Sequence, residues 1–344
     1  MRRLLFSAGL SALLAVKAGA QGPTGSEGSL FLLLPTGAQA VGMGQAMVAG
    51  KPGSEGIWWN PASIADQDKR ELAIHHSKTV AGVGDALTFV VPTRSYGTAA
   101  LSLNILNIGE QQVTDDLGDV IGVILPRDVV LAGTYSAAVT KRLSAGINYK
   151  VVQLRVDCSG QCSSVGPDVE SSRAVDLGAQ YELEAGAPLS LGVAIRNLGG
   201  RINSRETNQR DPLPTQVEVG ALYRLKFIDQ YVKDTELRVA GSYINSREFG
   251  GKSVRFGTDV MYQGKLHLRA GFVGHDRRGD ASAALGIGLQ SGGFVFDIAW
   301  KFGGLPADTG QSPVYVSLRY LVCSGGCAAR PATALAPGCT QSLS

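Results

Sequence analysis

Residues Phe294–Phe302 read F-V-F-D-I-A-W-K-F, and this pattern governs the architecture of the chain. Every second residue is large and apolar, while the residues between them include Asp297 and Lys301. A period of two residues is the pattern of a β-strand with one apolar and one polar face. The apolar face starts and ends in an aromatic residue, as in the lipid-facing band of a membrane barrel, and the charged face suits a polar lumen.

Similar stretches fill the chain from Arg70 to Val322. The stretches with strand character are Arg70–Lys78, Ala86–Pro92, Gly97–Ile108, Val129–Val139, Leu143–Asp157, Arg173–Glu184, Leu189–Asn197, Gln216–Leu225, Glu236–Ile244, Ser253–Tyr262, Lys265–Gly274, Ala281–Gln290, Gly293–Phe302 and Val314–Val322. In the fifth of them the alternation slips at Val151-Val152, which predicts a β-bulge.

The connections between these stretches differ in length according to their order. Those after odd-numbered strands are mostly long, as in Gly109–Asp128 and Leu198–Thr215, and those after even-numbered strands are mostly short, as in Gln263–Gly264. The short connection Thr79–Asp85 and the long connection Lys226–Thr235 are exceptions. Long outer loops and short periplasmic turns are typical of outer-membrane barrels. The sequence therefore predicts an all-β transmembrane barrel of about fourteen antiparallel strands, and a soluble exported β-sandwich is the alternative.

The N-terminus indicates export through a secretory signal peptide. A basic start and a mostly apolar run, Leu4–Val16, precede a small-residue cleavage motif at Ala18–Ala20, so the mature chain is expected to begin at Gln21. After this signal no apolar run approaches the roughly 18 residues of a membrane-spanning helix. The expected organisation is a signal peptide over 1–20, a spacer and lumen hatch over 21–69, a barrel over 70–322 and a tail over 323–344.

The balance of charge indicates no nucleic-acid partner. The chain has 32 Lys and Arg against 29 Asp and Glu. The expected signal peptide holds Arg2, Arg3 and Lys17, so its removal leaves 29 basic residues (32 − 3) against 29 acidic ones. Nucleic-acid binding needs a basic excess on one face, which a nearly neutral mature chain does not supply.

A Gly- and Ala-rich segment, Pro35–Ala62, precedes the first strand. Its small residues allow it to lie in a narrow space or to approach other backbone closely. Near its end Asn60 is expected to cap a helix whose first residue is Pro61. Trp58 and Trp59 are expected to anchor the segment, either in the lumen or at the barrel rim. A secreted segment with no role in the lumen is the alternative.

Two fragments of this segment resemble the N-terminal signature of the PorV/PorQ family of outer-membrane β-barrels, within the FadL-like superfamily. The fragments are Gly37-Ala38-x-Ala40-x-Gly42-Met43-Gly44 and Trp59-Asn60-Pro61-Ala62. The corresponding segment of those relatives is similar to a hatch folded into the lumen. The resemblance therefore implies a lumen plug formed by Gly42, Met43, Gly44, Trp58, Trp59, Asn60 and Pro61. The chain departs from its relatives at Lys51–Glu55, where they have an acidic, Ala-rich run.

The cysteines form two C-x3-C pairs, Cys158 with Cys162 and Cys323 with Cys327, and Cys339 is left over. Disulfides are the expected state of cysteines in an exported protein, so two local disulfides are predicted. Zinc is the alternative for either pair, but neither has a histidine nearby, and no metal site is expected. Cys339 is either a free thiol or an intermolecular link.

No catalytic signature is present. The chain lacks a nucleophile elbow, a zinc-protease motif and a phosphate-binding loop, so no catalytic residue, no enzyme activity and no cofactor are expected. His75 and His76 are adjacent on the first strand, so one of them is expected to face the lumen.

Two functions remain open. The PorV/PorQ resemblance implies a non-enzymatic component or scaffold for protein secretion or surface attachment, whose long loops hold secretion-machinery or client proteins. The FadL-like superfamily implies instead a passive channel for hydrophobic small molecules, with Leu30–Leu34 and Trp58-Trp59 as a candidate pocket. Outer-membrane lipid would surround the barrel in both cases.

Overall fold

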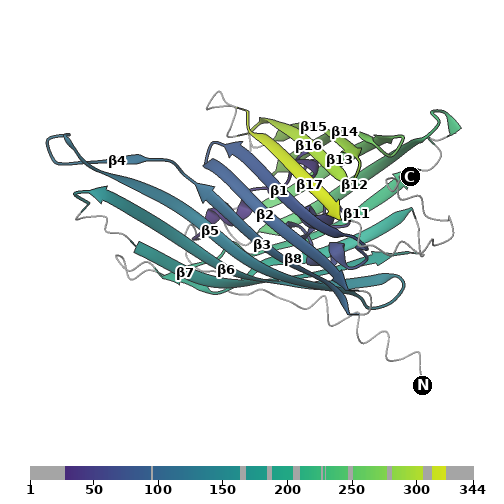
Figure 1. The fold of residues 1–344 in the computed structure, drawn as a ribbon, viewed down its shortest axis with the longest axis horizontal. Coiled ribbons are helices and arrows are strands. Elements are labelled where there is room, and N and C mark those ends of the chain that lie inside the picture. Colours follow the sequence, from purple (N-terminus) through teal and green to yellow (C-terminus); the bar gives the residue numbers. More distant parts are fainter. Residues whose placement is uncertain are drawn as a thin grey trace, which may run out of the picture.

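The computed structural model describes residues 28–322, apart from 94–95, 163–167, 184–187, 204–209, 226–227, 229, 247–250, 277–280 and 305–311. The expected signal peptide and the expected disulfide between Cys323 and Cys327 lie outside the described residues, as does Cys339. One large β-sheet closes on itself around several short helices (Figure 1).

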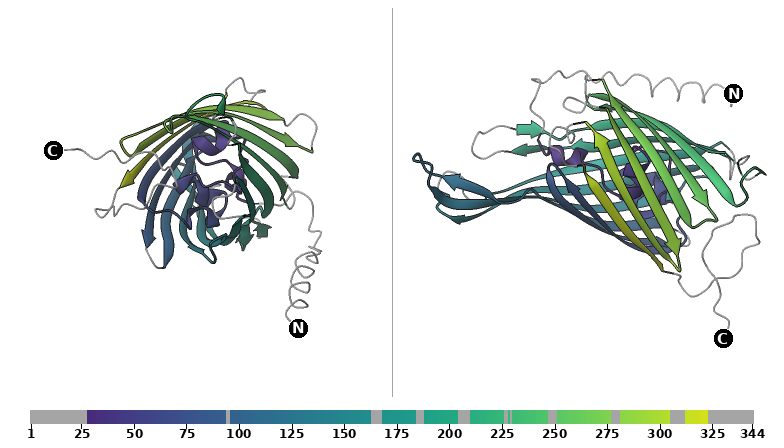
Figure 2. Two further views of the ribbon diagram at one scale, coloured as in Figure 1. Left: turned by 90° about the vertical axis from the view of Figure 1, so that its right-hand side faces the viewer. Right: turned by 90° about the horizontal axis from the view of Figure 1, so that it is seen from above.

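Antiparallel strands form the wall of a closed barrel (Figure 2). They are β1 (Arg70–Thr79), β2 (Gly82–Thr93), β3 (Gly97–Asn107), β5 (Val120–Ala138), β6 (Leu143–Gly160), β7 (Asp168–Glu182), β8 (Leu189–Gly199), β11 (Gln216–Leu225), β12 (Thr235–Ser246), β13 (Lys252–Tyr262), β14 (Leu266–His275), β15 (Ser282–Ser291), β16 (Phe294–Gly303) and β17 (Val314–Val322). Each wall strand pairs with the next, and β1 pairs with β17 to close the ring. The predicted fourteen-strand barrel is confirmed, and the sandwich alternative is wrong because the wall is a single closed sheet.

The two faces of the wall have opposite character. In β16, Phe294 and Phe296 lie on the outer face with 51% and 42% of their surface exposed. Asp297 of the same strand is fully buried on the inner face. The bulge predicted at Val151-Val152 is wrong, because β6 keeps a continuous register with both β5 and β7 at these residues. Val152 is an apolar residue on the lumen face, and this interrupts the polar pattern without any change in the backbone.

Three wall strands are longer than the others. β5, β6 and β7 have 19, 18 and 15 residues, whereas β2 and β17 have 12 and 9. Their extra length projects beyond the ring (Figure 1), where β4 (Gln111–Thr114) pairs with β5. We call this part, residues 108–127, 153–162 and 168–173, the blade. A short ribbon of β9 (Arg201–Asn203) and β10 (Arg210–Pro212) stands apart from the wall sheet.

The long loop expected over Gly109–Asp128 is wrong, because most of it is the β4–β5 hairpin. Pro126 interrupts the strand pattern of this stretch but lies within β5. Proline has no N–H to donate to a neighbouring strand, but its carbonyl can still accept a hydrogen bond. Here it accepts one from the N–H of Ile108 at 3.2 Å.

Residues 28–69, which we call the lumen segment, lie inside the ring (Figure 2, left). The segment contains three 3-10 turns and one short α-helix, which are η1 (Leu30–Leu33), α2 (Ala38–Gly42), η2 (Gly53–Trp58) and η3 (Pro61–Ile64). Nearly every residue from 38 to 64 is buried. Among the described residues no helix is both long enough and apolar enough to cross a membrane.

Candidate functional site

The lumen segment runs from one end of the barrel to the other. Beside the long connections, Gly28 donates its N–H to the carbonyl of Pro212 in β10 at 3.1 Å. At the opposite end, the side chain of Gln67 donates to Glu71 of β1 at 2.9 Å. Lys51 pairs there with Glu182, the last residue of β7, at 2.8 Å. The segment is therefore tied to the wall at both ends of the lumen.

The thin part of the segment lies directly on glycines of the wall, which are Gly257 of β13, Gly271 of β14 and Gly286 of β15. A Cβ atom added to Gly271 would collide with the backbone nitrogen of Gly44, and one added to Gly257 would collide with the carbonyl of Met43. Gly42 packs in the same way on Gly286. Backbone thus touches backbone, which is the close approach that small residues permit.

Asn60 joins the segment to the wall and starts a helical turn. Its Oδ1 accepts a hydrogen bond from the N–H of Ala62 at 3.0 Å, so the expected N-cap is present, with Pro61 as the first residue of η3. Its Nδ2 donates to the carbonyl of Val48 at 2.7 Å and to a carbonyl of β7. Gly178 of β7 leaves room for this side chain, because a Cβ atom there would collide with Oδ1 of Asn60.

Two arginines of the wall lie close to the ring of Trp59. The guanidinium carbons of Arg196 (β8) and Arg255 (β13) are 5.2 and 5.6 Å from its ring centroid, within cation–π range. Glu218 of β11 lies 3.4 Å from Arg196 and 3.9 Å from Arg255. Arg196 also donates to the carbonyl of Trp58 at 3.1 Å. Both tryptophans are buried in the lumen rather than exposed at the rim.

A series of ion pairs crosses the wall beneath α2 and η2. Arg319 of β17 lies 3.1 Å from Asp297 of β16, which lies 2.6 Å from Arg269 of β14, which lies 3.3 Å from Asp259 of β13. All four side chains are buried, as the alternation of these strands predicts. Arg319 also donates to the carbonyl of Pro52 in the lumen segment. The segment is thus held by wall charges that are themselves paired.

Glu55 is a buried carboxylate that the sequence analysis did not single out. It accepts hydrogen bonds from the N–H groups of Gln39 and Ala40 at 3.4 and 3.0 Å, at the start of α2. Burial raises the pKa of Glu55 to about 7, and the charge of Arg319 opposes this shift. Gly37 packs on this carboxylate with a φ of 95°, a conformation that side chains other than glycine rarely adopt.

The strand pattern contained a signal for two further lumen residues. Glu71 and Arg196 stand at inward positions of strands that were predicted correctly, so the phase of those strands places them in the lumen. Glu71 accepts a hydrogen bond from the N–H of Ser54 at 3.1 Å. His75 is buried and His76 is exposed, so the expectation that one of them faces the lumen is confirmed.

The cavities beside the lumen segment are small. One of about 20 Å³ is lined by Phe31, Leu32, Trp58 and Lys150, among others, and one of about 30 Å³ lies next to His75. A single water needs about 10–15 Å³, so each cavity has room for one to about two waters. Neither has room for a ligand of hydrocarbon size in this state.

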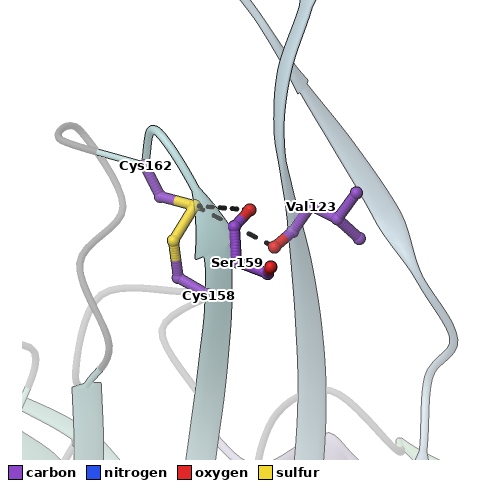
Figure 3. The surroundings of a disulfide bond; sticks show 4 residues. All are labelled: Val123, Cys158, Ser159 and Cys162. Carbon is purple, nitrogen blue, oxygen red and sulfur yellow. Dashed lines mark hydrogen bonds between the residues drawn. A yellow bond between two sulfur atoms is a disulfide. The ribbon is translucent and has the colours of Figure 1, made fainter.

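The predicted disulfide between Cys158 and Cys162 is present at the end of β6 (Figure 3). Its Cys162 sulfur lies 3.9 Å from the carbonyl oxygen of Val123 in β5. Next to it, Gln161 donates its N–H to the carbonyl of Ile121 at 2.9 Å. The disulfide therefore closes the turn at the end of β6, the hydrogen bond of Gln161 joins that turn to β5, and the zinc alternative for this pair is wrong. Within the described residues no group of three His, Cys, Asp or Glu is placed to hold a metal.

Several solved structures resemble this barrel. The structure titled "CymD monoaromatic hydrocarbon channel" has a TM-score of 0.55 at 14% identity and covers 84% of this chain and 97% of its own. The Pseudomonas putida toluene transporter TodX has a TM-score of 0.56 at 12% identity, over 83% and 97% of the two chains. A Pseudomonas aeruginosa FadL homologue has a TM-score of 0.51 at 13% identity, over 83% and 98%. At these identities the likeness shows the fold, that of a FadL-like outer-membrane barrel.

Comparison of sequences gives the family. No curated protein sequence matches the chain. The family described as "Type IX secretion system protein PorV" matches residues 21–241, which are 221 (241 − 20) of the 344 residues. This range contains the whole lumen segment and the blade, and it includes both fragments on which the resemblance was based. The chain belongs to the PorV family.

Proposed function

We propose that this protein is a non-enzymatic outer-membrane component of protein secretion, and that it works as a closed scaffold for protein partners. Membership of the PorV family supports the secretion role. The observation that carries the scaffold proposal is the fixed position of the lumen segment. Asn60, Trp59 and Glu55 are each buried and each contact the wall or another part of the segment by specific polar or cation–π interactions.

The cost of moving the lumen segment supports the same proposal. Leaving the lumen would strip Arg319 of its bond to the carbonyl of Pro52 and Arg196 of its bond to the carbonyl of Trp58. Hydrogen bonds that involve a charged group contribute about 1.5–3 kcal/mol each. The two cavities described beside the segment have room only for water-sized molecules. In this state the segment acts as a plug, with Trp58 and Trp59 as its anchor.

A passive channel for hydrophobic compounds is the second candidate. Its support is the likeness of the fold to structures named as a hydrocarbon channel and a toluene transporter. Phe31, Leu32 and Leu34 line the cavity next to Trp58, and all four residues belong to the lumen segment, so a larger apolar pocket would form there if Phe31–Leu34 moved away from Trp58 and the wall. A channel therefore requires a second position of the segment.

Purification from the native outer membrane in mild detergent, followed by mass spectrometry, separates the two candidates. The proposal predicts a protein that co-purifies in a fixed ratio, from the secretion machinery or its clients. A bound apolar small molecule without a protein partner would support the channel instead. Recovery of the chain in the soluble fraction would contradict its placement in the membrane.

A further inference from the structure

The blade extends the wall sheet into a region without a lumen. The last pair between β3 and β5 joins Asn107 to Arg127, so Val120–Pro126 continue beyond the ring. Seven residues at roughly 3.3 Å each reach about 23 Å further. The views of Figure 1 and Figure 2 (right) agree that this part stands clear of the barrel.

The centre of the blade is apolar on both faces. Val120–Leu125 read V-I-G-V-I-L, and successive residues of a strand point to opposite sides of the sheet. Val120 is 54% exposed, Leu117 at the hairpin tip is 88% exposed and Val169 on β7 is 49% exposed. Exposed apolar surface of this kind marks interaction sites in folded proteins.

One edge of the blade is open. In the part of the chain that the structure describes, β4 pairs with β5 and with no other strand. A free edge offers backbone N–H and C=O groups to an added strand, which gives affinity without regard to sequence. The apolar faces beside the edge would then select the side chains of that strand.

The charge of the β4–β5 hairpin defines the partner. Residues 108–126 contain Glu110, Asp115, Asp116 and Asp119 and no Lys or Arg. Asp115 is used locally, because its Oδ1 accepts hydrogen bonds from the N–H groups of Leu117 and Asp119 at 2.9 Å each. The side chains of the other three acids are exposed. Such a surface repels anionic lipid headgroups and attracts a basic partner.

The disulfide orders the end of β6 in the blade before any partner binds. Cys158–Cys162 fixes the turn at the end of β6, and the hydrogen bond from Gln161 to Ile121 joins this turn to β5. A surface that is already ordered loses less conformational entropy when a partner binds.

We propose that the blade binds an extended segment of a partner protein, with alternating basic and apolar side chains, as an added strand on β4. This inference rests on the proposed secretion function and names the surface and the chemistry of the partner for that function. The backbone of the added strand pairs with β4, its basic side chains lie near Glu110, Asp116 and Asp119 of the hairpin, and its apolar side chains extend the apolar surface of β5 beyond β4.

Labelled peptides test the chemistry with the purified full-length protein in detergent. The probes are a ten-residue alternating Lys/Val peptide, the corresponding Glu/Val peptide, and the Lys/Val peptide with two residues replaced by Pro. We expect fluorescence anisotropy to give at least tenfold tighter binding of the Lys/Val peptide than of the other two, with a loss of affinity as salt is raised. Equal binding of the Lys/Val and Glu/Val peptides would overturn the proposal.

Charge reversal tests the location. The variant Glu110→Lys/Asp116→Lys/Asp119→Lys is expected to bind the Glu/Val peptide more tightly than the Lys/Val peptide. A matched pair of single variants is Asp116→Lys and Asp68→Lys, because Asp68 is also exposed but lies outside the blade, just before β1. Asp116→Lys should weaken Lys/Val binding about threefold or more, and Asp68→Lys should leave it unchanged. Unchanged preference in the triple variant would overturn the proposal, and heat-modifiable gel migration checks that each variant is folded.

Native membranes separate this inference from the proposed function. If a protein partner co-purifies with the wild type and with Asp68→Lys but not with the triple variant, the blade is the binding surface. If the triple variant keeps that partner, the blade inference is wrong and the secretion role stands. If no protein partner co-purifies in a fixed ratio with the wild type or with Asp68→Lys, the secretion role fails and the inference fails with it.

Discussion

The ring and the blade are two parts of one sheet with opposite surroundings. In the ring every strand has two neighbours, the lumen face is covered, and charges such as Asp297 and Arg319 are buried in pairs. In the blade β4 has one neighbour, and the ion pair of Arg127 with Asp157 is loose, at 3.8 Å, with nearly half of each side chain exposed. The same two-residue period therefore builds a filled interior in one place and an open surface in the other.

The ring and the blade differ in what covers the surface of the sheet. Gly257 and Gly271 leave grooves that the backbone of Met43 and Gly44 fills, so the ring is complementary to a segment of its own chain. The blade presents exposed apolar residues and, in its β4–β5 hairpin, the exposed acids Glu110, Asp116 and Asp119. We therefore expect changes in the ring to alter stability and changes in the blade to alter binding.

The largest effect is expected from Gly271→Val. The new side chain would occupy the position of the Gly44 backbone, which cannot move without displacing α2. We expect a loss of stability on the order of 3 kcal/mol or more, or failure to fold. Heat-modifiable migration and tryptophan fluorescence measure this, since Trp58 and Trp59 are two of the three tryptophans.

Its matched control is Gly133→Val in β5. Gly133 lies on the outer face, and a Cβ atom added there meets nothing within 4 Å. We expect a change within about 0.5 kcal/mol for this variant, as for other substitutions away from packed sites. Equal effects of the two substitutions would mean that the lumen segment does not rest on the wall glycines.

The next largest effect on stability is expected from breaking a buried ion pair in the ring. Asp297→Asn leaves Arg269 and Arg319 buried without their shared carboxylate, and breaking a buried pair costs about 3–5 kcal/mol. Asp157→Asn removes the exposed partner of Arg127 in the blade and should cost less than about 1 kcal/mol. Urea unfolding in detergent compares the two variants. A cost for Asp157→Asn as large as that for Asp297→Asn would remove the distinction between ring and blade.

The sequence was sufficient for the ring because lipid and lumen demand alternating side chains along every wall strand. It failed at the blade, where Pro126-Arg127-Asp128 interrupts the strand pattern of a continuous β5, and at Val152, where an apolar residue faces the lumen. It also indicated a thin segment, which the family resemblance placed in the lumen, but not which wall residues that segment contacts. The match of Gly44 to Gly271 depends on register and depth in the barrel, and neither quantity is contained in local composition.

A change of pH is expected to have a smaller effect on stability, through Glu55 in the lumen of the ring. Glu55 keeps its proton up to about pH 7 in the folded state but only to about its ordinary value of 4.5 when unfolded. Between these values the folded state binds more protons, so the contribution of Glu55 to stability falls as the pH rises through this range. Glu55→Gln should remove that fall, measured as the urea midpoint of tryptophan fluorescence against pH. His75, Asp297 and Arg319 face Glu55 in both proteins, so parallel pH profiles would contradict this assignment.

The smallest effect on global stability is expected in the blade. Replacing Cys158 and Cys162 by serine opens a loop of only a few residues at the end of β6. The cost should be below about 2 kcal/mol and local, since short loops gain little from closure. Hydrogen exchange should become faster around Ile121 and Gln161 and stay unchanged in β13–β17. Faster exchange throughout the ring would show that the blade and the ring unfold together.

One measurement tests the central claim, that the lumen segment stays in place while the protein works. The N–H of Ala38 lies 2.8 Å from the hydroxyl of Ser317, so the two positions are adjacent, and Ala38→Cys with Ser317→Cys is designed to lock α2 to β17 by a disulfide. Serine replaces Cys323, Cys327 and Cys339 in this protein, and a version with Ala38→Cys alone controls for the reductant. We expect cells with the locked protein to secrete client proteins as well as cells with the control. Secretion that stops on locking and returns on reduction would contradict the claim, because the segment would then have to move.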